Sequence, residues 1–177
     1  MTISIRTERA SDVASREALL DKAFGRTRIR KTSERLRERR LPADGLAFTA
    51  LSEKGKVIGT LRLWSIIAGS AGPSLLLGPL AVDCRHQKKG IGRKLMDHAL
   101  ATARVLGHDS ILLVGDAPYY SRFGFDVALT RNLHLPGPVD RARFLGLELT
   151  PGALDGAEGL VGAAGAMIVG TAISAAA

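Results

Sequence analysis

The alternation of apolar and polar positions predicts a chain of short strands interrupted by a few helices. Ile3 and Ile5 alternate with polar residues and indicate a first strand. Further strands are predicted over residues 46–52, 56–67, 75–82, 110–114, 123–130 and 144–149. The polar residues 53–55 join the first two of these runs, which predicts a β-hairpin.

Helical spacing of apolar residues predicts two helices in the first part of the chain. The first follows Ser11 and Asp12, which can cap it, and would end at Gly25. Its apolar face would consist of Val13, Leu20, Ala23 and Phe24. The second helix is expected in the arginine-rich stretch that runs up to residue 40, where Leu41-Pro42 would stop it.

A third helix is predicted over residues 91–106, between two apolar strands. Its apolar stripe would consist of Ile91, Leu95, Ala99, Ala103 and Leu106. Because a strand–helix–strand unit normally makes a right-handed crossover, we expect strands 75–82 and 110–114 to be parallel. The first of these strands is apolar nearly throughout, which is typical of a strand covered on both faces. Gly78-Pro79 interrupts it and predicts a bulge or an unpaired edge.

Length and composition fit a single domain over residues 1–177, with 156–177 as a C-terminal extension. The 177 residues are 46% hydrophobic and 24% charged, as expected for a globular protein. The single cysteine, Cys84, excludes a disulfide framework, and the N-terminus lacks the apolar core of a signal peptide, so we expect a cytoplasmic protein. The uncharged tail after Glu158 is rich in glycine and alanine, which favours a packed strand or helix, or a loose end, over membrane insertion. No spacing of His, Cys or carboxylates suggests a metal site.

The net charge is +8, and the excess of positive charge clusters in residues 25–40. One interpretation is a patch for nucleic acid or for an anionic substrate. The other is a solvated helix face, which the interleaved Glu34 and Glu38 favour. Because the run contains no aromatic residue that could stack on bases, we do not expect nucleic acid as a partner.

A glycine-containing basic turn precedes the third helix. Gly90 and Gly92 would let a ligand approach the backbone closely, while the free amides and the dipole of the helix favour an anion. The positive charges around this turn come from Lys88, Lys89, Arg93 and Lys94. Neither a P-loop nor a dinucleotide fingerprint fits the spacing of these residues.

Two motifs give this chain a resemblance to the GNAT superfamily of N-acetyltransferases. Gln87, Gly90 and Gly92 match motif A, Gln/Arg-x-x-Gly-x-Gly/Ala. Residues 119–125, YYSRFGF, match motif B, an aromatic pair followed by x-x-x-Gly-Phe. The run of motifs from LGPLAVD at 77–83 to LPGPVD at 135–140 resembles the YhbS-like branch of predicted acetyltransferases, and the resemblance covers about residues 3–155. It implies an α/β fold (α+β by some schemes), with a twisted, mostly antiparallel mixed sheet of six to seven strands, a splayed parallel pair at its centre, and about four flanking helices.

The resemblance also implies acetyl-CoA as the donor. Main-chain groups of Leu80 and Val82 would pair with the pantetheine arm, and the amides of residues 88–93 would hold the pyrophosphate. The cofactor-binding residues expected on this basis are Leu80, Ala81, Val82, Gln87, Lys88, Lys89, Gly90, Ile91, Gly92 and Arg93.

For catalysis, the resemblance aligns Tyr120 with the family's usual general acid, which would serve the departing thiolate. The strand 75–82 contains no carboxylate, so the general base that the family resemblance leads one to expect is missing. Asp116 is a substitute candidate, and a water chain to bulk solvent is the alternative route for deprotonating the amine. The implied reaction is acetyl transfer to a primary amine by direct attack in a ternary complex. A small-molecule amine and a peptide amine both stay open as the acceptor, and so does a homodimer. The alternatives are a non-enzymatic acyl-CoA-binding protein and an RNA-associated protein that uses residues 26–40.

Overall fold

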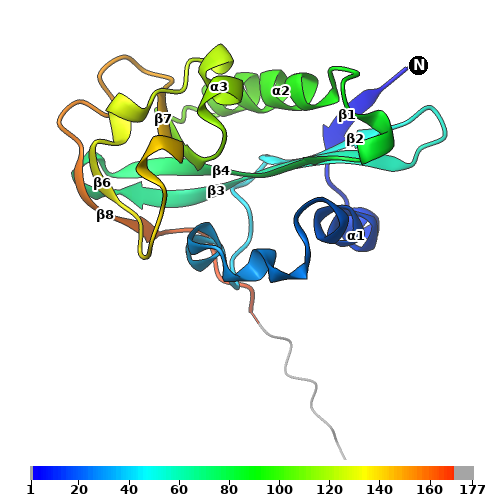
Figure 1. The fold of residues 1–177 in the computed structure, drawn as a ribbon, viewed down its shortest axis with the longest axis horizontal. Coiled ribbons are helices and arrows are strands. Elements are labelled where there is room, and N and C mark those ends of the chain that lie inside the picture. Colours follow the sequence, from blue (N-terminus) through cyan, green and yellow to red (C-terminus); the bar gives the residue numbers. More distant parts are fainter. Residues whose placement is uncertain (1, 170–177) are drawn as a thin grey trace, which may run out of the picture.

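A single eight-stranded sheet organises the chain in the computed structural model, which describes residues 2–169 (Figure 1). The strands are β1 (Ser4–Thr7), β2 (Ala47–Leu51), β3 (Val57–Ala68), β4 (Pro73–Val82), β5 (Ser110–Val114), β6 (Asn132–His134), β7 (Phe144–Glu148) and β8 (Glu158–Ala163). Their order is β1-β2-β3-β4-β5-β7, and β8 pairs with both β3 and β6. The pairs β4–β5 and β6–β8 are parallel, and the others are antiparallel.

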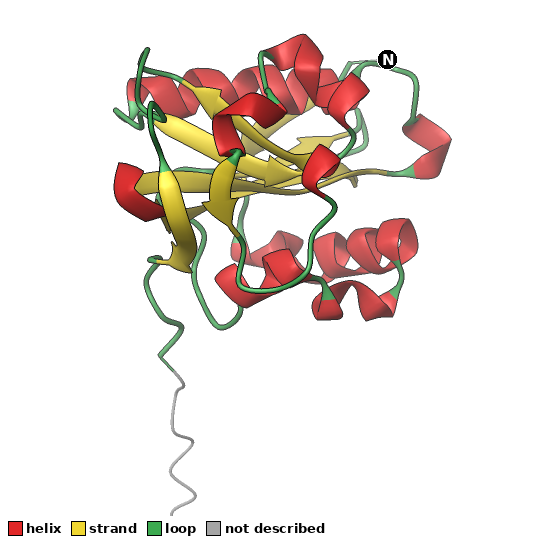
Figure 2. Cartoon of the chain, turned by 60° about the vertical axis from the view of Figure 1, so that its left-hand side comes forward, coloured by secondary structure: helices red, strands yellow, loops and turns green. Residues whose placement is uncertain are grey.

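Helices cover both faces of this sheet (Figures 1 and 2). The α-helices are α1 (Val13–Phe24), α2 (Ile91–Val105) and α3 (Ala117–Tyr120). The 3₁₀ turns are Ala10–Asp12, Arg26–Arg30, Thr32–Leu36, Gly69–Ala71, Cys84–His86, Ser121–Phe123, Val127–Thr130 and Arg141–Arg143. On one face lie α2 and α3, and on the other lie α1 and the arginine-rich segment (Figure 1). Within residues 2–169, no helix has the length and apolar character needed to span a membrane.

The expected mixed sheet with a splayed parallel pair is confirmed. The hairpin of β2 and β3 forms where the sequence predicts it, and β5 lies parallel to β4 after the α2 crossover. The sheet has eight strands rather than six or seven, because β6 and β8 join its margin. Within residues 2–169 there are three α-helices rather than four, because the arginine-rich stretch does not form one.

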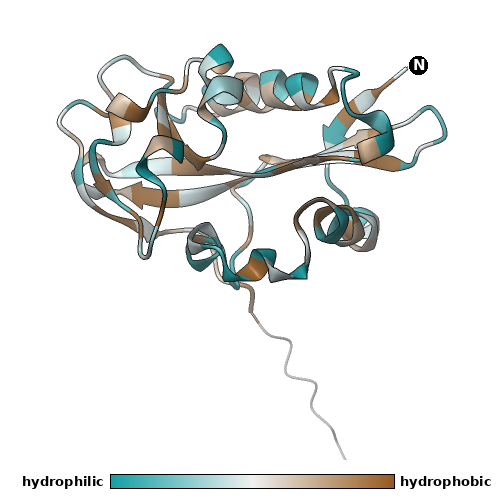
Figure 3. Ribbon diagram, viewed as in Figure 1, coloured by the Kyte–Doolittle hydropathy of each residue, from teal (hydrophilic) through white to brown (hydrophobic). Residues whose placement is uncertain are grey.

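The long helix α2 packs on the sheet through the stripe that the sequence predicts. Its residues Ile91, Leu95, Ala99 and Ala103 are almost fully buried, whereas Leu106 lies just past the helix and is exposed. A second buried cluster, around Trp64 and Phe144, lies on the other side of the sheet. Figure 3 shows the apolar residues along the strands and hydrophilic residues on the outward turns of α2. β4 therefore lies between two buried clusters, and its side chains contribute to both.

The buried face of α1 differs from the predicted one. Leu19 and Leu20 are buried with Arg16, while Val13 and Phe24 are exposed. Arg16 forms ion pairs with Glu8 and Glu17, so its charge is compensated where it is buried. A buried arginine in the first turn of the helix accompanies a buried face that differs from the one that apolar spacing alone predicts.

The arginine-rich stretch is not the predicted helix. It forms two 3₁₀ turns, Arg26–Arg30 and Thr32–Leu36, joined at Lys31, which has an extended backbone. Contacts distant in sequence hold it: Thr32 Oγ1 donates to Pro138 O at 2.6 Å, and Arg35 donates to Pro136 O. The expected solvated face is also wrong in part, because Leu36 and Arg37 are buried.

The strand predicted over residues 123–130 is also absent. Gly124 has a φ of 92°, which ends an extended run, and Asp126 accepts a hydrogen bond from Ala128 N at 2.8 Å. This side-chain bond starts the 3₁₀ turn Val127–Thr130 in place of a strand. Only Asp126 keeps a β-bridge, to Gly146.

Candidate active site

The sheet opens where β4 separates from β5. The two strands pair only at Leu75–Ile111 and Leu76–Leu112, although β4 continues to Val82. Against β3, Gly78 and Pro79 lie between the pairs Leu63–Leu77 and Leu61–Leu80, opposite a single residue. This is the bulge that Gly78-Pro79 predicts. Trp64 Nε1 donates to Gly78 O at 2.6 Å and anchors the bulge.

Main-chain groups of Leu80 and Val82 face the gap left by β5. Among the main-chain groups of this segment, Asp83 N donates to Ile58 O at 2.9 Å, so the N–H of Asp83 points toward β3. Because these groups alternate along a strand, those of Leu80 and Val82 point away from β3. Gln87 Nε2 donates to Val82 O at 3.4 Å from that open side. This segment of β4 therefore offers an edge to an extended ligand.

The basic turn ends in an open helix N-terminus. Gly90 has a φ of 76° and Lys88 a φ of 62°, so the chain turns sharply and points its amides outward before α2. No side chain caps α2 through a hydrogen bond at Gly90. At the start of the turn, hydrogen bonds from the side chain and backbone of Arg85 hold the pKa of Asp83 well below its usual range.

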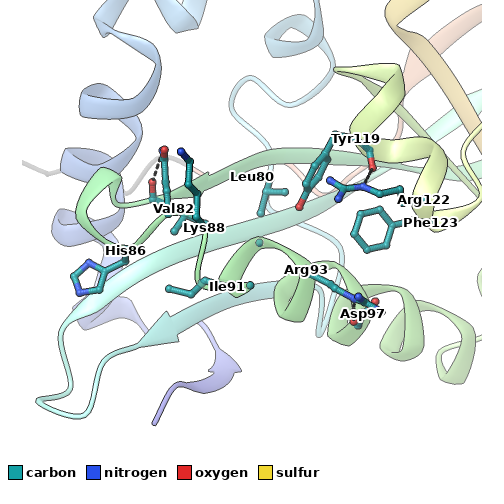
Figure 4. A pocket seen from close by; sticks show the side chains of 13 residues that line it. Leu80, Val82, His86, Lys88, Ile91, Arg93, Asp97, Tyr119, Arg122 and Phe123 are labelled. Carbon is teal, nitrogen blue, oxygen red and sulfur yellow. Dashed lines mark hydrogen bonds and ion pairs between the residues drawn. The ribbon is translucent and has the colours of Figure 1, made fainter. Parts of the chain in front are cut away.

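A cavity of about 720 Å³ lies beside this edge and this helix terminus (Figure 4). Eight of the ten predicted cofactor-binding residues line it: Leu80, Val82, Gln87, Lys88, Gly90, Ile91, Gly92 and Arg93. Lys89 and Ala81 do not line it. The side chain of Ala81 instead packs against Leu19 and Leu20 of α1, because neighbouring strand residues point to opposite faces.

Tyr119, the first residue of the motif B match, also contributes to this cavity. Its hydroxyl lies over Gly92, so that a Cβ at Gly92 would come within 2.9 Å of it. The Arg122 guanidinium lies 4.7 Å from the Tyr119 ring centre, and Arg122 Nε donates to Tyr119 O at 3.2 Å. Burial raises the pKa of Tyr119. Phe123 and Asp97 also line the cavity, and no spacing in the sequence marks them as site residues.

A second cavity of about 630 Å³ adjoins the first at the same strand. Its walls are the arginine-rich segment, the bulge of β4, the end of β5 and residues 138–143. Leu80 and Tyr119 line both cavities, so the two spaces meet where β4 has left β5. No motif in the sequence indicates this second cavity.

Tyr120, the predicted general acid, lines the second cavity. Its ring occupies the space that a side chain at position 115 would need, because a Cβ at Gly115 would lie 2.3 Å from Tyr120 Cε2. Tyr119 and Phe125 pack edge-on against the ring, with centroids 4.9 and 6.0 Å away. Burial raises the pKa of Tyr120 to about 12, so the phenol keeps its proton at neutral pH.

Asp116, the candidate base, lines the same cavity as Tyr120. It lies at the N-terminus of α3, and its Oδ2 accepts a hydrogen bond from Tyr119 N at 3.2 Å. His86 lines the first cavity, with its Nδ1 4.0 Å from Asp83 Oδ1. No group of three or more His, Cys, Asp or Glu side chains suited to a metal ion occurs in the described part of the chain.

Comparisons with known proteins agree with this geometry. Residues 14–125 match the acetyltransferase (GNAT) family. The uncharacterized N-acetyltransferase YhbS of Escherichia coli K12 is 31% identical over 161 residues, which cover 89% of this chain and 93% of the relative. The structure of E. coli YhbS in complex with CoA matches with a TM-score of 0.75 and 29% identity, covering 92% of this chain and 89% of that one. A GNAT family acetyltransferase from Brucella melitensis in complex with acetyl-CoA matches with a TM-score of 0.65 and 27% identity, covering 92% and 96% of the two chains. The chain therefore belongs to the GNAT family of acetyltransferases.

Proposed function

We propose that this protein transfers the acetyl group of acetyl-CoA to a primary amine, which attacks directly while both substrates are bound. The observation that carries this proposal is the meeting of two cavities at Leu80 and Tyr119. A donor in the first cavity and an amine in the second would come together there. The CoA complex of E. coli YhbS and the acetyl-CoA complex of the B. melitensis protein support the choice of donor.

The residues of the first cavity fit acetyl-CoA. The open backbone edge at Leu80 and Val82 suits the amides of a pantetheine arm, and the amides and positive charges of residues 88–93 suit a pyrophosphate. Gly92 leaves space under the Tyr119 hydroxyl that a larger residue would fill. Bound there, acetyl-CoA supplies an activated thioester, and the protein orients it.

Tyr120 is proposed as the group that stabilises the departing sulfur. With a pKa of about 12, its phenol holds its proton across the neutral range. The thiol of CoA resembles that of cysteine, whose pKa is about 8.5, so complete proton transfer from Tyr120 to the departing thiolate is energetically unfavourable. A hydrogen bond donated as negative charge develops on the sulfur is therefore the main contribution expected of Tyr120.

Deprotonation of the amine is assigned to Asp116 or to a water chain. Asp116 is exposed and lines the second cavity together with Tyr120, so it can reach an amine there directly or through water. Its cap hydrogen bond to Tyr119 N occupies one carboxylate oxygen and leaves the other available. An Asp116→Asn variant that retains full activity at every pH would favour the water route.

The test combines donor binding with turnover. Calorimetric titration with acetyl-CoA and CoA measures binding, and release of free thiol in the presence of a panel of amines measures transfer. We expect Tyr120→Phe to lower kcat about 100-fold or more without abolishing acetyl-CoA binding. Tyr119→Phe is the matched control for Tyr120→Phe, because it removes the hydroxyl of the neighbouring tyrosine and leaves that of Tyr120 in place.

Two outcomes would overturn the proposal in different ways. If the protein binds neither acetyl-CoA nor CoA, the proposal of acetyl transfer is excluded. Binding without turnover across a broad amine panel would favour a non-enzymatic acyl-CoA-binding protein. The proposal also includes a cytoplasmic location, which the single, unpaired Cys84 supports.

A further inference from the structure

The second cavity carries an excess of positive charge. Five cationic side chains line it: Arg28, Arg30, Lys31, Arg37 and Arg143. Three carboxylates line it: Glu34, Asp116 and Asp140. Two of these carboxylates act as caps, because Asp116 accepts from Tyr119 N and Asp140 accepts from Ala142 N at 3.1 Å. The third, Glu34, pairs with Arg37 at 2.8 Å.

Two arginines of the arginine-rich segment have donors engaged by the protein itself. Arg28 forms ion pairs with Glu17 and Asp21, and Arg35 donates to Pro136 O. These side chains hold the arginine-rich segment in place, and their role is structural. Arg37 differs from them.

Arg37 is buried and only partly satisfied. Its side chain is 8% exposed, and its Nη2 bonds Glu34 and Ser33 Oγ. Its Nε is buried without a hydrogen-bond partner among residues 2–169. Its Nη1 lies 3.7 Å from the position of a Cβ on Gly78, which places the guanidinium beside the bulge of β4. A buried donor without a partner is rare in folded proteins. The residue that carries it, Arg37, lines the second cavity.

Arg143 supplies a second cation at the tyrosine end of the cavity. It is exposed and close enough to Tyr120 for its charge to act on that phenol. Its main chain is fixed by the hydrogen bond from Gly115 N to Arg143 O at 2.9 Å. An acceptor in this cavity would therefore lie between a cation at the bulge and a cation near Tyr120.

We propose that the acceptor is a primary amine that also carries an oxyanion, either a carboxylate or a phosphate. Arg37 binds this oxyanion, and Arg143 is the second cation. This inference rests on the proposed function. The guanidinium fork matches both groups, and hydrogen bonds between ionised partners are the strong ones. An oxyanion would engage the unused donors of Arg37. A neutral alkylamine would leave them unpartnered and would add its own positive charge when protonated.

Matched pairs of acceptors test this inference. Thiol release is measured with β-alanine against β-alaninamide and with O-phosphoethanolamine against ethanolamine, and each rate is expressed per concentration of unprotonated amine. In at least one pair, we expect the anionic member to have a kcat/KM about tenfold higher or more, which corresponds to one strong charge-assisted contact. The pair that responds identifies the oxyanion as a carboxylate or a phosphate.

Three variants assign the preference to residues. Arg37→Gln and Arg143→Gln should reduce the ratio of anionic to neutral kcat/KM to less than about threefold. Arg26→Gln removes the same charge from an exposed position that does not line the cavity, and should keep the ratio. Because a substitution at the buried Arg37 can unfold the protein, thermal melting is recorded for each variant, and the exposed Arg143 provides the independent test.

A binding measurement covers the case in which none of these four amines reacts. With the first cavity saturated by CoA, inorganic phosphate should raise the melting temperature of the native protein and of Arg26→Gln more than that of Arg143→Gln. The inference is overturned by equal use of neutral and anionic amines, by a preference that survives both arginine substitutions, or by equal phosphate effects on these proteins. Thiol release from neutral amines alone would leave the proposed acetyl transfer intact while removing this inference.

Discussion

The two cavities beside β4 are built from different parts of the protein. The first is lined mainly by a strand edge, a glycine turn and a helix N-terminus, which lie within residues 80–93. The second is lined by side chains from segments about a hundred residues apart, such as the arginine-rich turns and residues 138–143. A site that binds its ligand mainly through the main chain is formed by neighbouring residues and can be recognised as a sequence motif. A site that binds through side chains depends on which distant segments pack together. Four predictions test whether the two cavities can be perturbed separately.

The largest effect is expected from Gly115→Ala. The new Cβ would lie 2.3 Å from Cε2 and 2.9 Å from Cδ2 of Tyr120, so the ring must move. Because a displacement of about 1 Å in a catalytic group can cost about 100-fold in rate, we expect kcat to fall by about that factor. The acetyl-CoA dissociation constant should change by less than about twofold, since Gly115 does not line the first cavity. Steady-state kinetics and calorimetry measure the two effects.

Gly162→Ala provides the control for Gly115→Ala. A Cβ at Gly162 meets no atom within 4 Å, so this substitution should leave kcat unchanged. An unchanged kcat in Gly115→Ala as well would argue that the position of Tyr120 does not matter to the reaction.

The second prediction concerns the first cavity. In Gly92→Val, the Cβ would lie 2.9 Å from the Tyr119 hydroxyl, and the two methyl groups would enter the cavity. We expect acetyl-CoA to bind about tenfold more weakly, which is about 1.4 kcal/mol. Gly92→Ala should lose less affinity, because it adds only the Cβ. Equal affinity of the native protein and Gly92→Val would show that the donor does not occupy this space.

The third prediction uses the carboxylate that anchors the basic turn. Asp83 accepts from Arg85 N at 3.0 Å and is 7% exposed, so Asp83→Ala should cost about 1–2 kcal/mol of unfolding free energy at pH 7. The pKa of Asp83 is depressed in the folded protein, mainly by its side-chain hydrogen bond with Arg85. Its contribution is therefore fully present above the unfolded pKa of about 3.9, declines as the pH falls below that value, and is lost completely only when the pH falls through the lower pKa of the folded state.

Urea unfolding at pH 7 and pH 3 checks this dependence. The difference in unfolding free energy between the native protein and Asp83→Ala should narrow at the lower pH. A difference that stays constant would mean that Asp83 acts through its shape and not through its charge.

The smallest effect is expected from Thr32→Val, on the side of the second cavity. This change removes the bond from Thr32 Oγ1 to Pro138 O and should cost about 0.5–1 kcal/mol. Because that bond joins two walls of the second cavity, the KM for the acceptor should rise about twofold, with acetyl-CoA affinity unchanged. Thr102→Val removes a similar bond, to His98 O within α2, and should change stability without changing either KM.

Much of the first cavity could be predicted from the sequence, because its determinants are local. The apolar run of β4, the Gly78-Pro79 interruption and the stripe of α2 each predict an element by themselves, and each element is confirmed. A glycine in the basic turn predicts a backbone conformation that other residues rarely adopt, and Gly90 does adopt a left-handed conformation. The orientation of Tyr119 could not be predicted, because it depends on how α3 packs over Gly92.

The second cavity could not be predicted, because its determinants lie far apart in the chain. The arginines of residues 26–40 suggest a helix by composition, but contacts with Pro136 O and Pro138 O hold this segment in 3₁₀ turns. The strands β6 and β8 are short, and β8 contains two glycines, so neither shows a clear alternation. The role of residues 170–177, which belong to the predicted extension, lies outside the described part of the chain.

The last described residues have a consequence for the order in which the protein can be completed. Leu41 N donates to Ala166 O and Ile168 N donates to Arg39 O, both at 2.8 Å, so residues 166–168 run beside the end of the arginine-rich segment. During synthesis, β3, β4, α2 and β5 can come together once residues 57–125 have emerged, whereas this junction must wait for nearly the whole chain to leave the ribosome. A chain shortened at residue 163 should therefore keep the strand edge and helix N-terminus that line the first cavity, and lose support for the arginine-rich wall of the second cavity.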